Sequence, residues 1–291
     1  MTATMETRAA ADLRDQRRLF RLNRSLPTAE EYGWMRATED AWIGRLAAEH
    51  VADAPEFESL SDLLKALAGL HAAERADVPP SQDYLALSAT LEEFKAVIAQ
   101  FAVDGLIESQ ALLPVVPRLP YRSGMAVFRV LIDELGCGNE DQAHSQLYRD
   151  LLSELGMPVD LDAYVDGTGA AGLAYVNLFH WLAARAETPE YFLGAYAYFE
   201  AGVLYGFQSF AQAAKRLGIA RHEYFTEHLY IDQYHSRQMR GAIRAYDEEV
   251  GVDLAKVWAG VTLTSAVVAE ANEAAIALAC ADSAARSGAG S

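Results

Sequence analysis

Apolar residues recur every three to four positions along most of the 291-residue chain, a spacing that gives a helix one buried face. Alanine, leucine and glutamate dominate, and the alternation of β-branched residues that is typical of strands is nearly absent. Proline and glycine interrupt the pattern, for example at Pro79-Pro80 and at Gly136-Cys137-Gly138. The pattern predicts an all-α protein with helices over approximately residues 8–24, 29–51, 57–73, 84–116, 118–136, 140–156, 169–186, 188–217, 220–248 and 253–286.

The proline-containing stretch from Arg75 to Asp83 is the best candidate for a boundary within the chain. It predicts an N-terminal helical arm over residues 1–83, a helical bundle over residues 84–286 and a flexible tail over residues 287–291. His71, on an amphipathic helix of the arm, is expected to be exposed. We expect the arm to pack on the bundle or on a second copy of the chain in a homodimer. Its apolar stripes contain Leu13, Phe20, Leu22, Trp34 and Trp42.

Charge and composition narrow the class of function. The formal net charge of −17 repels nucleic acids and anionic lipids, so neither is an expected partner. Hydrophobic residues make up 52% of the chain, but polar residues interrupt every long apolar run, so we expect no membrane span. The first residues lack the apolar segment of a secretory signal. Cys137 and Cys280 are too few for a disulfide framework, so a reducing, cytoplasmic location is expected.

Two histidines and an aspartate fall on one face of the helix predicted for residues 220–248. His228, Asp232 and His235 are four and then three residues apart, so at about 100° per residue their side chains project within about 60° of one another. Imidazole and carboxylate groups together are ligands that suit iron. Each residue alone would more often be a solvated or hydrogen-bonded polar side chain. The three together predict a metal site.

Further ligands have to come from facing helices of the bundle. Glu200 is the lone charged residue of the apolar, aromatic-rich segment from Tyr191 to Tyr205, where a carboxylate is costly unless it is paired, protonated or metal-bound. Glu134 and His144 flank the glycine-rich break. Asp141 competes with Glu134 for the ligand role, and Glu108 is a weaker candidate in a more polar helix. The chain contains no Glu-x-x-His motif, which disfavours a ferritin-like site.

These elements resemble the haem-oxygenase-like di-iron oxidases. Glu134 and His144 flank a glycine-rich helix break, Glu200 follows in a hydrophobic helix, and the His-x3-Asp-x2-His element comes last. The resemblance covers about residues 86 to 285 and implies an up-and-down helical bundle. It also implies two ferrous ions, O2 as co-substrate and, in some cases, an external reductant, with Glu108 as an additional ligand. The six ligands that it implies are Glu134, His144, Glu200, His228, Asp232 and His235.

By the same resemblance, the protein oxidises a small-molecule substrate. The expected reaction is N-oxygenation, desaturation or oxidative C–C cleavage of a free amino acid or related amine in specialised metabolism. Tyr196, Leu204 and Met239 are the candidate substrate contacts, and the tyrosines of that helix favour a compact polar substrate. Two alternatives remain open at this point: an alkene-forming fatty-acid decarboxylase of the same family, and a non-catalytic helical scaffold.

Overall fold

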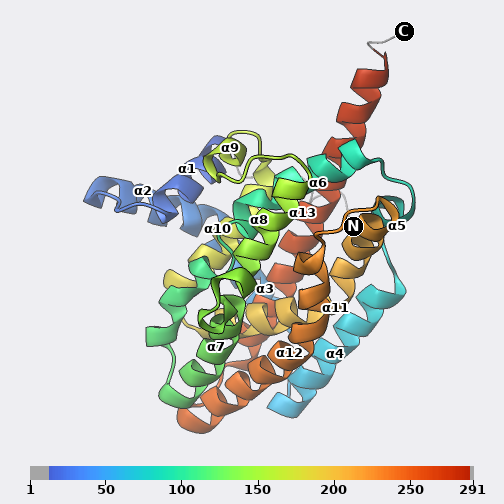
Figure 1. Cartoon of the computed structure of the whole chain (residues 1–291). Coiled ribbons are helices and arrows are strands. Elements are labelled where there is room, and N and C mark those ends of the chain that lie inside the picture. Colours follow the sequence, from blue (N-terminus) through green and yellow to red (C-terminus); the bar gives the residue numbers. More distant parts are fainter. Residues whose placement is uncertain (1–12, 289–291) are drawn as a thin grey trace.

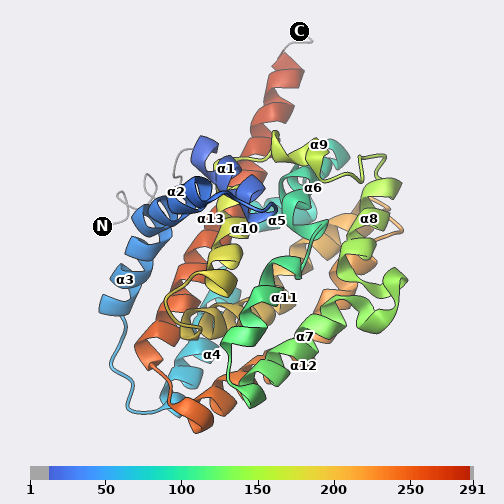
Figure 2. The same cartoon turned by 90° about the vertical axis from the view of Figure 1, so that its left-hand side faces the viewer.

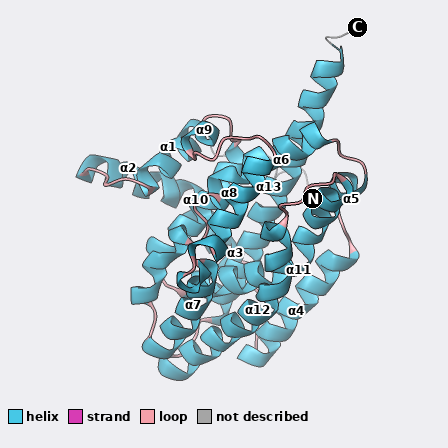
Figure 3. Cartoon of the chain, viewed as in Figure 1, coloured by secondary structure: helices cyan, strands magenta, loops and turns pink. Residues whose placement is uncertain are grey.

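The computed structural model describes residues 13–288, and within that range the chain forms helices, turns and loops with no strand. Figures 1 and 3 show the helices gathered into one bundle whose long members run side by side. The all-α prediction is therefore confirmed. The predicted start of the first helix, residues 8–12, and most of the predicted tail lie outside the described range.

The centre of the bundle is formed by three long helices from the C-terminal part of the chain, α11 (Glu190–Arg216), α12 (Glu223–Val250) and α13 (Leu254–Gly288). α11 packs against both α12 and α13, and α7 (Tyr121–Glu134) runs along α12 (Figure 2). α10 (Ala170–Ala184) is almost entirely buried and packs against α13. This arrangement is the up-and-down bundle that the sequence resemblance implied.

Two glycines allow α11 and α13 to approach each other closely. A Cβ atom added at Gly194 would overlap the backbone of Val257, and one added at Gly260 would overlap the backbone of Tyr191. Because side chains are absent at this crossing, the two backbones can pack in direct contact. The contact fixes the position of α11, and with it Glu200, which follows Gly194 by six positions.

Two segments, Leu91–Arg118 and Leu254–Ala285, are long and apolar enough to cross a membrane by length and composition. In the structure α6 (Leu91–Gly105) and α13 pack against each other. α13 also contacts α10, α11 and α3 (Arg45–Ala52), so much of its apolar surface faces other helices. Packing buries 56% of the apolar window of the first segment and 39% of that of the second, and the expectation of no membrane span stays a prediction.

The helices of the predicted arm cover one side of the bundle. α1 (Leu13–Asn23) packs on α10, and α4 (Leu60–Ala76) packs on α11 and α13. A buried ion pair of 2.6 Å between Glu39, at the end of α2 (Ala29–Glu39), and Arg185 ties the arm to the residue that follows α10. The arm therefore packs on the bundle of its own chain, whereas the homodimer stays a prediction.

The expected exposure of His71 is wrong. Its side chain is buried, stacks on Tyr198 with ring centroids 4.9 Å apart, and lies with Nδ1 3.0 Å from the hydroxyl of Tyr205. The amphipathic pattern of α4 assigned one face to solvent, but α4 lies on α11 with His71 turned toward that helix.

The predicted helix 84–116 is divided in the structure. A first helix, α5 (Pro80–Leu87), precedes α6, which ends at Gly105, and a turn then leads into the 3-10 helix Gln110–Arg118. Ser109 in the turn has a positive φ of 65°. The remaining elements are the π-helical turn Asp40–Gly44, the 3-10 turns Gly136–Gly138 and Glu140–Gln142, α8 (His144–Glu154) and α9 (Asp162–Val165).

Candidate metal centre

Seven buried side chains from separate parts of the chain meet inside the bundle, and they include every metal-ligand candidate of the resemblance together with Glu108. They form two groups, in each of which one ligand atom per residue lies within 4.8 Å of the others. Glu134 belongs to both groups. The first group is Glu108, Glu134, His144 and His228, and the second is Glu134, Glu200, Asp232 and His235.

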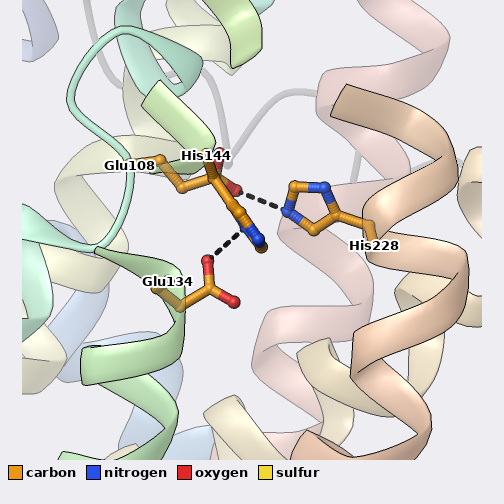
Figure 4. A group of neighbouring side chains, drawn as sticks. All are labelled: Glu108, Glu134, His144 and His228. Atoms are coloured by element: carbon orange, nitrogen blue, oxygen red, sulfur yellow. Dashed lines mark hydrogen bonds and ion pairs between the residues drawn. The ribbon is translucent and has the colours of Figure 1, made fainter. Parts of the chain in front are cut away.

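The first group joins four segments of the chain (Figure 4). Nδ1 of His144 lies 2.8 Å from Oε2 of Glu134, and Nε2 of His228 lies 3.1 Å from Oε1 of Glu108. The two imidazole rings have centroids 4.1 Å apart. Glu108 was expected on a helix, but it lies in the turn after α6, where the chain bends toward α12. The group therefore presents two carboxylates and two imidazoles to one point.

His228 is oriented by its own helix. Its Nδ1 lies 2.5 Å from the backbone carbonyl oxygen of Tyr224, one turn earlier in α12. A carbonyl oxygen can only accept a hydrogen bond, so Nδ1 carries the proton and donates it. Nε2 faces Glu108, and once deprotonated it would offer its lone pair to a metal ion. A ligating histidine typically donates its second N–H to an acceptor of this kind, which fixes the ring.

The second group converges on His235. Its Nδ1 lies 3.1 Å from Glu134 Oε1, 3.2 Å from Glu200 Oε2 and 3.1 Å from Asp232 Oδ1. On the other side of the ring, Nε2 lies 3.5 Å from Asp133 Oδ2. The ring thus has one nitrogen among three carboxylates and the other near an acceptor outside the group. With three carboxylates and one imidazole, this group contains more hard oxygen ligands than the first group.

Buried carboxylate oxygens that accept no hydrogen bond indicate whether these residues fit metal ions. Oδ2 of Asp232 and Oε2 of Glu108 are buried and accept no hydrogen bond. Such atoms are costly in a protein interior unless a cation compensates them. The four carboxylates of the two groups, when ionised, carry the charge that two divalent cations would balance. The donor set therefore fits two ions of the ferrous type, with Glu134 placed to contact both.

Burial and mutual interaction shift the pKa values of these groups in the protein alone. Burial raises the pKa of Glu200 to about 7, and the neighbouring carboxylates add to the rise. Burial also opposes ionisation of Glu134, but the adjacent His144 holds the pKa of Glu134 well below its ordinary value. Burial opposes protonation of His228, yet Glu108 raises the pKa of His228 well above its ordinary value. The charges of these carboxylates and imidazoles therefore have to be balanced within the centre.

The glycine-rich break brings Glu134 and His144 together although nine residues separate them. Glu134 ends α7 and His144 begins α8. Between them Gly136 has φ +80°, a left-handed conformation that favours glycine. A Cβ atom at Gly136 would lie 2.6 Å from the backbone nitrogen of Ala143, so the chain folds back on itself here. The tight reversal places the two ligands side by side.

Gly136→Ala is therefore expected to weaken iron binding by at least about tenfold, because Ala143 and the adjoining His144 would be displaced. Gly138→Ala is the matched control. Gly138 has a similar φ of +87°, but nothing lies within 4 Å of its Cβ position, so the strain is similar without the displacement. Ferrous titration of the two variants measures the difference, and equal losses of affinity would contradict this account.

Asp141, the alternative to Glu134, is exposed and belongs to neither group. It lies in the 3-10 turn Glu140–Gln142, where its backbone N–H donates to the side chain of Asn139 at 3.2 Å. This turn directs Asp141 away from the bundle interior. The structure thus favours Glu134 as the carboxylate at this point of the chain.

Two cavities adjoin the centre. A small one of about 30 Å³ is lined by five of the ligand candidates together with Tyr196. A larger one of about 410 Å³ extends from there toward α4 and α5, and both cavities are lined by Asp104, Tyr175 and Phe199. The shared residues mark the place where a molecule in the larger cavity comes nearest to the ligands.

Of the three predicted substrate contacts, one lines a cavity in the structure and two do not. Tyr196 lines the small cavity, and its buried hydroxyl has no hydrogen-bond partner. Leu204 and Met239 line neither cavity, so the structure does not place them beside a substrate. Met239 is fully buried in the hydrophobic core one turn beyond His235. The helical angle gave its side chain nearly the same direction as His228, but the cavities meet α12 nearer its start, between Tyr224 and Asp232, about two turns or more before Met239.

Asp104 is a polar residue at the centre that sequence reasoning did not select. Its Oδ2 accepts a hydrogen bond of 2.8 Å from the hydroxyl of Tyr175. Burial, with the charge of Glu108 adding to it, raises the pKa of Asp104 to about 7. Its position one helical turn before Glu108 was visible in the sequence, but there it indicated only a more polar helix.

Comparison with known proteins supports an iron-dependent role for this centre. A family model described as an iron-containing redox enzyme matches residues 95–268, which include all seven ligand candidates. A nitrosourea synthase from Streptomyces achromogenes subsp. streptozoticus is 32% identical over 152 residues, covering 50% of this chain and 31% of the relative. The chain therefore spans about a third of the length of that relative. The protein belongs to the family of iron-containing redox enzymes with a haem-oxygenase-like fold, and it is an oxidoreductase.

Proposed function

We propose that the protein is an O2-dependent di-iron oxygenase that oxidises a nitrogen atom of an amino-acid-derived substrate. The observation that carries the proposal is the pair of ligand groups that share Glu134 and open toward a cavity of about 410 Å³. That volume lies within the range of small-molecule sites. Two ferrous ions held there would supply the electrons that activate O2.

The side chains around the centre would hold the ions, exclude water and orient the substrate. The ligands named above would position the ions, and their buried placement would keep bulk water out. Phe199 and Tyr175 stand between the centre and the larger cavity and would direct the substrate nitrogen toward the centre. Asp104 and the unpaired hydroxyl of Tyr196 would accept or donate hydrogen bonds to that nitrogen.

The charge of the larger cavity supports an amine over a fatty acid. Its acidic lining residues outnumber its one basic residue, Arg75, so a cation is favoured and a carboxylate with a long alkyl chain is not. The matched relative is, by its name, a synthase of a nitrosourea, a compound that contains an oxidised nitrogen. The acidic side chains of the cavity are Glu74, Asp77, Asp83 and Asp104.

The test is an anaerobic ferrous titration followed by an oxygen pulse, observed by optical absorption. We expect two irons per chain and a transient visible band whose formation or decay is accelerated by amino acids and not by fatty acids. His228→Ala removes a ligand of the first group and should abolish the band. His222→Ala, near the start of the same helix and outside both groups, should retain it.

Absence of both iron uptake and a transient in the wild-type protein would overturn the proposal. Acceleration by fatty acids alone would favour the decarboxylase alternative.

A further inference from the structure

The larger cavity is lined by the last turn of α4, which carries a carboxylate held by three hydroxyl groups. The carboxylate of Glu74 accepts hydrogen bonds from Tyr198 at 3.0 and 3.1 Å, from Ser265 at 2.7 Å and from Tyr205. The donors come from α11 and α13. Glu74 is therefore fixed in place, and its side chain lines the cavity.

His71 supports this carboxylate without neutralising it. The hydroxyl of Tyr205 donates its hydrogen to Glu74, so its oxygen accepts from Nδ1 of His71 at 3.0 Å. Burial lowers the pKa of His71 to about 4, and the ring stays neutral near pH 7. The neutral ring therefore brings no positive charge next to Glu74.

A guanidinium group lies next to this carboxylate. Arg75 follows Glu74 in α4, lines the same cavity and lies over the ring of Tyr205, 5.4 Å from its centroid. A fixed carboxylate and a guanidinium side by side are complementary to the ammonium and carboxylate groups of an α-amino acid. Neither residue falls within the region that the family model matches, residues 95–268.

The part of the cavity that adjoins the small one carries a second carboxylate, Asp104, held by Tyr175 at 2.8 Å. It lines the small cavity as well, where the hydroxyl of Tyr196 is buried without a hydrogen-bond partner. A ligand that reaches this end would meet an acid and an unpaired hydroxyl. These groups are complementary to a cationic nitrogen that can also donate or accept a hydrogen bond.

We propose that the last turn of α4 is the head-group site for an α-amino acid with a basic side chain. Glu74 binds its ammonium group, Arg75 binds its carboxylate, and Asp104 receives the basic nitrogen beside the metal centre. The inference rests on the proposed function for the reaction that follows binding. The N-terminal segment, which lies outside the family match, then determines which substrates enter.

The test is binding of a panel of small molecules to the anaerobic ferrous protein, measured by titration calorimetry. Arginine and lysine should bind, whereas norleucine, which lacks the basic nitrogen, and glutamate, which reverses its charge, should bind at least about tenfold more weakly. Glu74→Gln and Asp104→Asn should each weaken arginine binding by at least about tenfold. Glu92→Gln, which removes the same charge at the start of α6 from a residue that lines neither cavity, should change it by less than about threefold.

Arg75→Gln separates head-group recognition from net charge. It should weaken the binding of arginine but leave that of agmatine, which lacks the carboxylate, within about threefold. Circular dichroism and iron content of each variant show whether it is folded. If folded Glu74→Gln binds arginine like the wild type, or if norleucine binds as tightly as arginine, the inference is overturned.

The calorimetric test needs no oxygen, so it fails independently of the proposed function. Selective binding of basic amino acids without any oxygen chemistry would overturn the proposed function and leave the head-group site. Oxidation of amines with no preference for basic amino acids would overturn the head-group site and leave the proposed function.

Discussion

Replacing Glu134 by glutamine is expected to reduce the ferrous iron bound at saturation from two ions per chain to fewer than one. Glu134 is the one residue present in both ligand groups, so its loss leaves each group with three ligands. The amide also removes one of the four negative charges that two divalent ions would balance. Iron content after anaerobic loading and desalting measures the effect, and oxygen-dependent activity should be lost with it.

Asp141→Asn is the matched control for this prediction. Asp141 lies seven positions after Glu134, is exposed, and is outside both groups, so its variant should bind as much iron as the wild type. If Asp141→Asn lost iron and Glu134→Gln retained it, the assignment of the shared ligand would be reversed.

Gly194→Ala is expected to be the most destabilising small substitution in the core. A methyl group there would overlap the backbone of Val257, so α11 and α13 would have to separate along their crossing. We expect a loss of about 3 kcal/mol in the free energy of unfolding and a decrease of roughly 6–12 °C in melting temperature. Because α11 carries Glu200, iron binding should weaken as well.

Gly241→Ala in α12 makes the same chemical change in open space, since nothing lies within 4 Å of its Cβ position. Alanine is a better helix former than glycine, so this variant should gain up to about 1 kcal/mol. Thermal and denaturant unfolding of both variants measure the contrast. A Gly194→Ala protein as stable as the wild type would show that the helices can separate without cost.

The helical fold and part of the centre were predictable from local pattern. Helical periodicity predicted the long elements that became α11, α12 and α13, with ends within a few residues of those observed. The spacing of His228, Asp232 and His235 placed them on one face, because the angle between residues of a single helix is fixed by its geometry. The isolation of Glu200 among apolar residues marked it in the same way, since a buried charge needs a partner.

Where residues from different segments were candidates for the same role, only the tertiary structure distinguished them. Glu134 and Asp141 were both plausible until the tight turn at Gly136 placed one inside the bundle and the other in solvent. Leu204 and Met239 pointed inward by their helical angle, yet the cavity lies elsewhere. A helix angle gives direction about its own axis and does not say which neighbour occupies that side.

What the sequence by itself determined is the class of fold, the family and the chemistry of the ligand-bearing helices, because these follow from spacing and residue type. Tertiary structure alone decided the sharing of Glu134 between two groups, the turn that delivers Glu108, and the cavity lined by Glu74 of the N-terminal arm. Glu74 and Asp104 lie on different helices, and only the packing of α4 and α6 around α11 and α13 brings them to the lining of one cavity. Such contacts between distant segments are set by how helices pack, and no local pattern contains them.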